Sequence, residues 1–350
     1  MKIYKYNFGQ IIAAENLFLA WDAFKQGKRN KPDVMTFERD LERNIFALQR
    51  ELKRGEYRHG PYSGFYVTDP KMRHIHKAMV RDRIVHHAVY AVLATLFEET
   101  FICNSFSCRI GYGTHRGVAK LKELTRQVSK NNSVPCYALK CDIRKFFDSI
   151  DHAILIKLLR KRIKDERTMG LLEEIIGSFT SARSTAIERK GLPLGNLTSQ
   201  LFANIYMNEF DQFVKHDLHV RRYIRYTDDF IIVDADKEYL QTLIPRCARF
   251  LDEQLSLTLH PKKIEIKALH QGVDFLGYIT FPHHRLVRTK TKRRMAAKLH
   301  RRVGEYEAGR SDKKQVEQSL RSYLGVLSHA NTHELAVDFK EQCWFLANKE

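Results

Sequence analysis

The amino-acid sequence predicts an α+β fold in which helices pack on a small antiparallel sheet. From residue 136 to about residue 285, strand and helix signals follow in the order strand, helix, helix, strand, strand. Residues 137–143 predict a strand, residues 151–163 and 198–214 predict helices, and residues 223–233 predict two strands broken in the middle. Such a series, without any repeat period, favours a layer of helices on one face of the sheet.

The segments on either side of this sheet are predicted to be mostly helical. Apolar residues recur at helical spacing within residues 17–48, and a second helical run covers residues 78–97. Residues 55–70 are rich in Gly, Pro, Tyr and Ser, and the alternation of Phe65 with Val67 predicts a short hairpin. Beyond residue 286 the composition changes, so we expect a domain boundary followed by helices.

The composition favours a nucleic-acid partner. The 350 residues include 60 Lys and Arg against 41 Asp and Glu, a formal charge of +19 that attracts polyanions. The longest apolar stretch, residues 88–97, is too short to span a bilayer, and the N-terminus lacks a secretory pattern. We therefore expect a cytoplasmic protein with no membrane partner. The six cysteines include no Cys-x-x-Cys pair and predict no zinc site.

Positive charge is concentrated near the C-terminal helices. Residues 285–302 contain nine Lys or Arg and no acid. A solvated helix face is one explanation, but so many unopposed charges repel one another. We therefore favour a surface that follows nucleic-acid phosphates.

Two acidic residues stand inside the apolar strand pair. Asp228 and Asp229 lie between apolar residues 223–224 and 230–233. Ionised carboxylates are costly there and repel each other, so a cation would stabilise them; a tight turn is the alternative explanation. Asp142, at the end of the first strand, supplies a third carboxylate. Two Mg²⁺ ions held about 3.5–4 Å apart by such acids activate a hydroxyl nucleophile and stabilise leaving pyrophosphate, which is nucleotidyl transfer.

The residues around these acids resemble reverse transcriptase motifs. Residues 226–229, Tyr-Thr-Asp-Asp, resemble the Tyr-x-Asp-Asp box, and residues 142–148 resemble the first catalytic motif, in which an aromatic residue follows the aspartate by five positions. Further motifs follow in the family's order at residues 69–73, 81–85, 105–113, 191–204, 257–263 and 275–278.

The resemblance implies a right-hand polymerase. Residues 1–135 would form the fingers, and residues 286–350 a helical, basic thumb. Residues 136–285 would form the palm, a small antiparallel sheet backed by helices, with a fingers-contributing insertion near residues 165–195.

The resemblance also implies catalytic roles. Asp142 and Asp228 would bridge two Mg²⁺ ions, with a weaker contribution from Asp229 and a ligand from the carbonyl of Ile143. Lys263 would protonate the leaving pyrophosphate as general acid.

Substrate contacts are implied for other motif residues. Lys71 and Arg73 would hold the incoming triphosphate, while Arg109 would contact nucleotide or template unless it only pairs with an acid. Phe147 would exclude ribonucleotides, and strand alternation would place Phe146 in the core. Leu194 would lie near the nascent base pair, and Gly195 would permit close backbone approach to the substrate. Gln200 would orient the templating region, or else support the site from behind. The last motif, Phe275, Leu276, Gly277 and Tyr278, would position the primer end; a core strand kinked at its glycine is the alternative.

One nonapeptide resembles a subgroup, the enzymes of diversity-generating retroelements. In residues 192–200, Ser199-Gln200 replaces the Ser-Pro of related enzymes, and Leu194 stands where they carry Gln. The resemblance implies copying of a template-repeat RNA into cDNA from deoxynucleoside triphosphates, with errors opposite adenine for mutagenic retrohoming. It also implies binding of the cDNA/RNA hybrid and of a small, basic, ring-forming accessory protein. An aliphatic side chain cannot hydrogen-bond near the nascent pair and constrains base geometry less than an amide.

Other functions remain open on the sequence. The chain would alternatively be an antiphage-defence enzyme or another bacterial reverse transcriptase, such as a retron or intron enzyme. A catalytically silent RNA-binding assembly factor is a further alternative, against which the intact Asp142, Asp228 and Asp229 argue.

Overall fold

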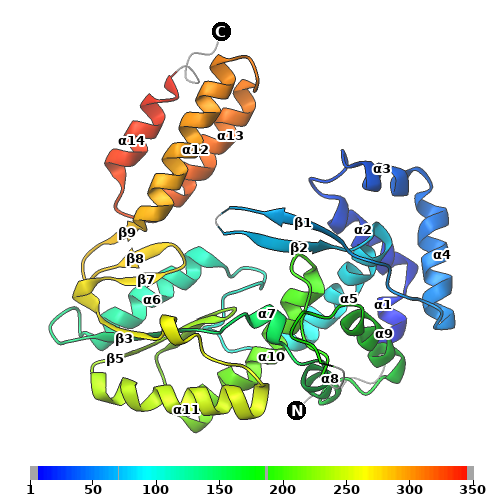
Figure 1. Ribbon diagram of the computed structural model, residues 1–350, viewed down its shortest axis with the longest axis horizontal. Coiled ribbons are helices and arrows are strands. Elements are labelled where there is room, and N and C mark those ends of the chain that lie inside the picture. Colours follow the sequence, from blue (N-terminus) through cyan, green and yellow to red (C-terminus); the bar gives the residue numbers. More distant parts are fainter. Residues whose placement is uncertain (1–6, 70, 186–187, 345–350) are drawn as a thin grey trace.

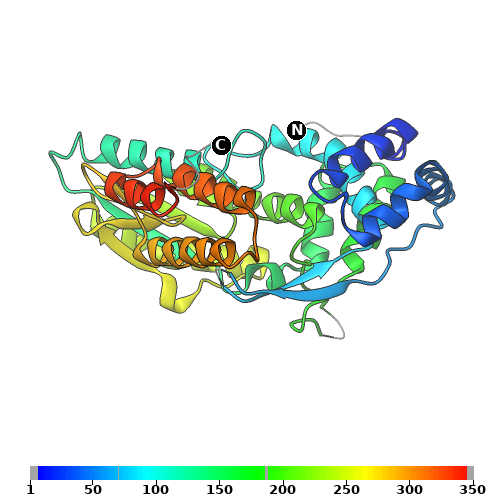
Figure 2. The same cartoon turned by 90° about the horizontal axis from the view of Figure 1, so that it is seen from above.

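The computed structural model describes residues 7–69, 71–185 and 188–344, and it confirms the mixed helix and sheet class. The N-terminal helices lie at one end of the longest axis and the central sheet lies at the other, the hairpin extends between them, and the C-terminal helices project upward from the sheet end (Figure 1). Seen from above, the C-terminal helices lie over the half of the molecule that holds the sheet (Figure 2). Within the described ranges, no helix is long and apolar enough to cross a membrane.

The central sheet is antiparallel and has the strand order β4-β5-β3-β6. Its strands are β3 (Tyr137–Asp142), β4 (Tyr223–Tyr226), β5 (Asp229–Asp234) and β6 (Glu265–Ala268). The predicted first strand and the predicted strand pair are confirmed to within a residue at each end. The edge strand β6 was not expected from the sequence.

Helices cover both faces of this sheet, which corrects the expected single layer. Along β5, Phe230 and Ile232 pack into one core with α8, α10 and α11, whereas Ile231 and Val233 pack into a second core with α6 and the C-terminal region. A strand that is apolar on both faces needs cover on both sides. The helices of this part are α6 (Thr114–Val128), α7 (Phe146–Ser149), α8 (His152–Arg160), α9 (Glu166–Gly177), α10 (Leu197–Gln212) and α11 (Lys237–Leu255), with helical turns η1 (Phe213–Asp217), η2 (Pro261–Lys263) and η3 (Leu269–Gln271).

The N-terminal region packs around one long helix, as its apolar periodicity predicts. This helix, α5, packs against α2 and α10, and its apolar side chains join the larger core. The predicted hairpin is confirmed, and its two strands pair from Ser63 opposite Lys77 to Val67 opposite Arg73. The elements are α1 (Phe8–Ile11), α2 (Ala14–Lys25), α3 (Pro32–Arg39), α4 (Leu41–Arg54), β1 (Ser63–Val67), β2 (Arg73–Lys77) and α5 (Val80–Glu98).

A small three-stranded sheet connects the central sheet to the C-terminal helices. Its order is β7-β8-β9, and β9 ends at Val287, so the change to helices falls slightly beyond the expected boundary at residue 286. The elements are β7 (Val273–Phe275), β8 (Tyr278–Thr280), β9 (Arg285–Val287), α12 (Thr289–Glu307), α13 (Lys313–Leu327) and α14 (His333–Glu341).

The basic run lies mostly on α12, and acids from elsewhere oppose part of its charge. Asp69, near the tip of the β1–β2 hairpin, contacts Arg294 and Lys298 of α12. Arg288 pairs with Asp274. The hairpin therefore reaches from the N-terminal region to the C-terminal helices. The sequence predicted that the charges of the basic run would be unopposed, and this contact opposes part of them.

Candidate active site

Three carboxylates meet at one end of the central sheet. The β3–β5 register sets Asp142 opposite Asp229. Tyr226 pairs with Asp229 across the β4–β5 hairpin, so Thr227 and Asp228 form its turn. Thr227 has φ of +57°, a left-handed conformation that is uncommon for a β-branched residue. The turn brings Asp228 to the side of Asp142, as the sequence predicts.

The carboxylates destabilise one another when they are ionised. Burial raises the pKa of Asp228 to about 6, and the neighbouring charges of Asp142 and Asp229 add to this effect. Burial also raises the pKa of Asp229, although Lys140 opposes the change. The Oδ1 atom of Asp229 is buried without a hydrogen-bond partner. Crowded, partly desolvated carboxylates with an unpaired oxygen favour a cation, because its charge offsets both the repulsion and the burial.

Lys263 supplies one positive charge at this site. Its Nζ atom lies 2.8 Å from Oδ1 of Asp142, and its side chain remains 42% exposed. The backbone holds it there, because the amide of His260 donates to the carbonyl of Asp142 and η2 follows directly. Ile143 is buried and bridges Leu259, next to this contact. Among the described residues, no three His, Cys, Asp or Glu side chains already lie close enough together to hold a metal ion, so Asp142, Asp228 and Asp229 share one end of the sheet without yet forming a metal-binding arrangement.

Phe146 and Phe147 lie in a short helix rather than in a strand. Phe146 is buried in the core, as expected, and Phe147 is partly buried and packs against the same core; its role at the sugar stays a prediction. The reason for the burial of Phe146 is different from strand alternation: β3 ends at Asp142, and both rings belong to α7. The carbonyl of Phe147 accepts a hydrogen bond from the amide of Leu192. This bond joins the first motif to the nonapeptide.

The nonapeptide packs on the hairpin. The carbonyl of Leu194 accepts a hydrogen bond from the amide of His76 on β2. Gly195 has φ of +108°, and a Cβ atom there would lie 2.8 Å from Cγ2 of Ile75. The protein's own hairpin thus already requires a glycine at this position, and the expected approach to the substrate stays a prediction. Gln200 is exposed on the first turn of α10.

A cavity of about 310 Å³ lies beside the nonapeptide and is basic. Lys28, Lys77 and Arg83 line it together with Gly195 and Gln200. Asp33, which bonds both Lys77 and Arg83, offsets part of this charge. Two further lining side chains carry buried nitrogens without hydrogen-bond partners, Nδ2 of Asn196 and Nδ1 of His86. Positive side chains lining a cavity are suited to an anionic ligand.

Arg109 has a structural role. Of the two expectations, pairing with an acid is the one that the structure shows, and the expected contact with nucleotide or template is corrected. Its guanidinium forms an ion pair with Glu98 at 2.6 Å and donates to the carbonyls of Ile102 and Ser105 at 2.7 Å. Its side chain is only 4% exposed. Lys71 and Arg73 are exposed at the hairpin and available to a ligand. Pro70, in the same motif, lies outside the described residues.

The late motif at residues 275–278 forms the β7–β8 turn. Phe275 and Tyr278 pair across it and point into the second core, where both are buried. The Tyr278 hydroxyl donates to the carbonyl of Val326 on α13. Leu276 and Gly277 form the turn itself, both with positive φ. Leu276 and Gly277 remain partly exposed, whereas the rings of Phe275 and Tyr278 are enclosed.

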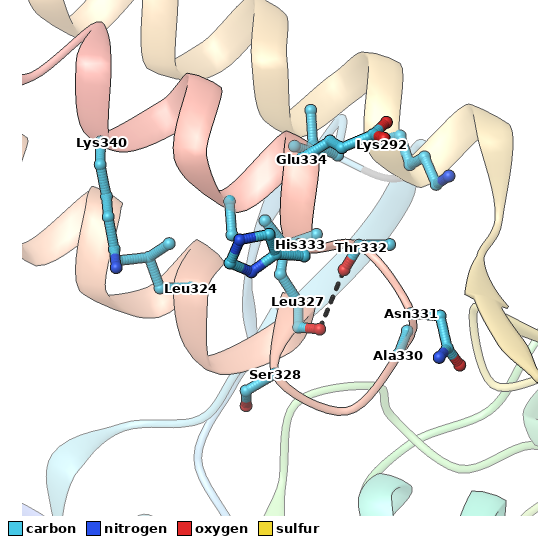
Figure 3. Close-up of a pocket in the computed structure, with 12 residues that line it drawn as sticks. Lys292, Leu324, Leu327, Ser328, Ala330, Asn331, Thr332, His333, Glu334 and Lys340 are labelled. Atoms are coloured by element: carbon cyan, nitrogen blue, oxygen red, sulfur yellow. Dashed lines mark hydrogen bonds between the residues drawn. The ribbon is translucent and has the colours of Figure 1, made fainter.

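A larger cavity lies away from the carboxylates. It measures about 790 Å³ and lies among the C-terminal helices, where Lys292, His333 and Lys340 line it with apolar residues such as Leu324 (Figure 3). Two of its lining residues bond each other: the hydroxyl of Thr332 donates a hydrogen bond to the carbonyl of Leu327. No residue of the predicted site lines it.

The sequence did not indicate the support beneath the carboxylate turn. Arg225 and Asp211 form a buried ion pair at 2.6 Å, and the side chains of both are 0% exposed. The only signal was an arginine in an otherwise apolar strand, directly before the Tyr-Thr-Asp-Asp motif. Its acidic partner lies on α10, and the pairing depends on the tertiary fold.

Comparison with known proteins gives a consistent family assignment. Residues 68–280 match the family model described as reverse transcriptase (RNA-dependent DNA polymerase). Protein YkfC of Escherichia coli (strain K12) is 26% identical over 287 residues, covering 70% of this chain and 71% of YkfC. Group II intron-encoded protein LtrA of Lactococcus lactis subsp. cremoris is 25% identical over 303 residues, covering 68% of this chain and 49% of LtrA. The chain thus spans about half the length of LtrA.

Proposed function

Because this chain belongs to the reverse transcriptase family of RNA-dependent DNA polymerases, we propose that Asp142, Asp228 and Asp229 are its nucleotidyl-transfer site. The observation that carries the proposal is the crowding of carboxylates at the β3 and β5 ends. Burial first, and then the charges of Asp142 and Asp229, raise the pKa of Asp228, and Oδ1 of Asp229 is buried without a hydrogen-bond partner. These features are costly unless a cation binds, so they support a catalytic rather than a packing role.

The proposed cofactor is a pair of Mg²⁺ ions. Reverse transcriptases generally use divalent metal ions, and the donor set here is made of the oxygens that Mg²⁺ prefers. The carboxylates of Asp142, Asp228 and Asp229 would hold the ions, with the carbonyl of Ile143. When bound, the ions would activate the primer hydroxyl and stabilise the leaving pyrophosphate.

Lys263 has two proposed roles at this site. Without metal its ammonium neutralises Asp142, since the two lie 2.8 Å apart. During the reaction it would give its proton to the leaving pyrophosphate. Both roles use the same partly exposed side chain, which would exchange Asp142 for the phosphate.

The nucleotide and template are proposed to lie along the hairpin and the nonapeptide. Lys71 and Arg73 would hold the triphosphate, and Phe147 would pack against the sugar and reject a 2′-hydroxyl. The basic cavity beside Gln200 would receive the template strand, because its positive side chains match the charge of the phosphates. Leu276 and Gly277 would support the primer end.

We further propose that the enzyme belongs to the diversity-generating subgroup. Leu194 and Ser199-Gln200 support this, because an aliphatic residue at the nascent pair reads the template adenine less strictly. The product would be error-prone cDNA for mutagenic retrohoming, made in the cytoplasm with a small, basic, ring-forming accessory protein. The second candidate is an intron-associated enzyme, which the similarity to LtrA favours.

A primer-extension assay tests the site. Purified protein with an RNA template, a DNA primer and Mg²⁺ should extend the primer, and Asp142→Asn should reduce the rate at least about 1,000-fold by removing one metal ligand. The matched control is Asp148→Asn, which changes an acid of α7, outside the proposed ligand set. Full extension by Asp142→Asn would show that the carboxylate assignment is wrong.

A further inference from the structure

A buried guanidinium lies directly beneath the carboxylate turn. Arg225 on β4 donates from Nε to Oδ1 of Asp211 at 2.7 Å and from Nη2 to Oδ2 at 2.6 Å. Both side chains are 0% exposed. A buried ion pair is weak evidence for stability, because the desolvation of two charges offsets their attraction. The remaining contacts of Arg225 therefore indicate what the pair does.

Those contacts reach the turn itself. Nη1 of Arg225 donates to the carbonyl of Thr227 at 3.0 Å, and the same nitrogen lies 3.4 Å from Oδ1 of Asn204. Nη2 also donates to the hydroxyl of Ser105 at 3.0 Å. The rigid, planar guanidinium of Arg225 thus forms hydrogen bonds with α10, with the segment before α6 and with the turn at the same time.

The turn is of a kind that needs such support. Thr227 has φ of +57°, and a β-branched residue holds this conformation only when its surroundings impose it. Its hydroxyl donates to the hydroxyl of Ser107 at 2.6 Å, and Ser107 in turn accepts from Asn204 through its carbonyl at 2.8 Å. Thr227 is therefore held at two points: Arg225 bonds its carbonyl, and Ser107 bonds its side chain.

We propose that Arg225 is a positioning residue that, through the Thr227 carbonyl, sets the place of Asp228 at the active site. Asp211 and Asn204 hold Arg225 from α10, the same helix whose first turn carries Gln200 at the basic cavity. The nucleotide-facing and carboxylate-bearing parts of the site thereby share one support. This inference rests on the proposed role of Asp228 as a metal ligand.

The test is Arg225→Lys, with Tyr223→Phe as the matched control. Lysine keeps the charge beside Asp211 but has one terminal nitrogen, so it cannot also bond Ser105 and Thr227. Tyr223→Phe removes a 2.7 Å hydrogen bond to the same Oδ1 of Asp211 without touching the turn. Both variants should melt earlier than the unmodified protein. Only Arg225→Lys should lose about 100-fold in kcat, while its template–primer Kd stays within about two-fold.

A second readout does not depend on turnover. Calorimetric titration with Mn²⁺, without nucleic acid, should show binding weakened at least about tenfold in Arg225→Lys and unchanged in Tyr223→Phe. Equal kcat and equal Mn²⁺ affinity in the two variants would overturn the proposal. If the unmodified protein extends no primer, the proposed function fails by itself, and the Mn²⁺ titration still decides the role of Arg225.

A third variant covers the case in which Arg225→Lys does not fold. The triple change Arg225→Met, Asp211→Leu and Tyr223→Phe replaces the buried polar groups by apolar ones of similar size, which proteins often tolerate. It should fold yet retain the loss in kcat and in Mn²⁺ affinity. Activity equal to that of the unmodified protein would refute the proposed positioning role.

Discussion

Asp228→Asn is expected to stabilise the metal-free protein while abolishing its activity. The pKa of Asp228 rises from 3.8 to about 6, first through burial and then through Asp142 and Asp229. The difference is about 2 pKa units, and each unit corresponds to about 1.4 kcal/mol, so ionised Asp228 lowers the free energy of unfolding by about 3 kcal/mol above pH 6. Asparagine keeps the shape and removes the charge.

Calorimetry or thermal unfolding monitored by circular dichroism at pH 8 in EDTA would measure this gain. We expect a rise of several degrees in the melting temperature of Asp228→Asn, since about 1 kcal/mol shifts a domain of 150–250 residues by about 2–4 °C. The native state binds the Asp228 proton more tightly than the unfolded chain. The advantage of the variant is therefore full above about pH 6 and shrinks as the pH falls towards 3.8.

The control for this experiment is Asp217→Asn, which removes an exposed carboxylate and should leave the melting temperature nearly unchanged. Added Mg²⁺ should stabilise the unmodified protein and not Asp228→Asn, because only the former retains the full ligand set. If Asp228→Asn melts at the same temperature as the unmodified protein, or below it, at pH 8 in EDTA, the carboxylates are not electrostatically crowded and the reasoning is refuted.

Three further predictions concern the substrate side of the site. Phe147→Ala should relax the rejection of ribonucleotides at least about tenfold, measured as the ratio of kcat/KM for deoxynucleotide and ribonucleotide; an unchanged ratio would remove its proposed contact with the sugar. Leu194→Gln should lower misincorporation opposite template adenine, read by sequencing the cDNA, whereas an identical error spectrum would contradict the subgroup proposal. Gly195→Ala should lower the free energy of unfolding by about 1–3 kcal/mol through its positive φ and its contact with Ile75. An added Ile75→Ala should recover only the part due to that contact.

Several features of the site could be predicted because they depend on local pattern. A strand that ends in Asp142 and a strand pair broken at Asp228 and Asp229 follow from apolar runs and from the cost of charge within them. The edge strand β6 could not be predicted in this way. Its four residues are all only partly buried, so neither an alternating nor a continuous apolar pattern marks it.

The roles of single residues were less predictable, because they depend on partners distant in sequence. Arg109 has the same chemistry whether it meets a nucleotide or Glu98, and only the fold brings Glu98 to it. Gly195 is required by Ile75, which comes from the hairpin. Arg225 shows the same limit, since its position in the apolar strand β4 is costly until Asp211 pairs with it.

The sequence by itself determined the mixed helix and sheet class, and it indicated a polyanionic partner and three candidate acids, since charge balance, apolar periodicity and motif order are properties of the chain. Only the tertiary structure decided which charges neutralise one another. It paired Lys263 with Asp142 and Asp69 with α12, and it placed Arg225 beneath the carboxylate turn. The physical reason is that Coulomb attraction and desolvation depend on separation in space, and strand register and helix packing set that separation.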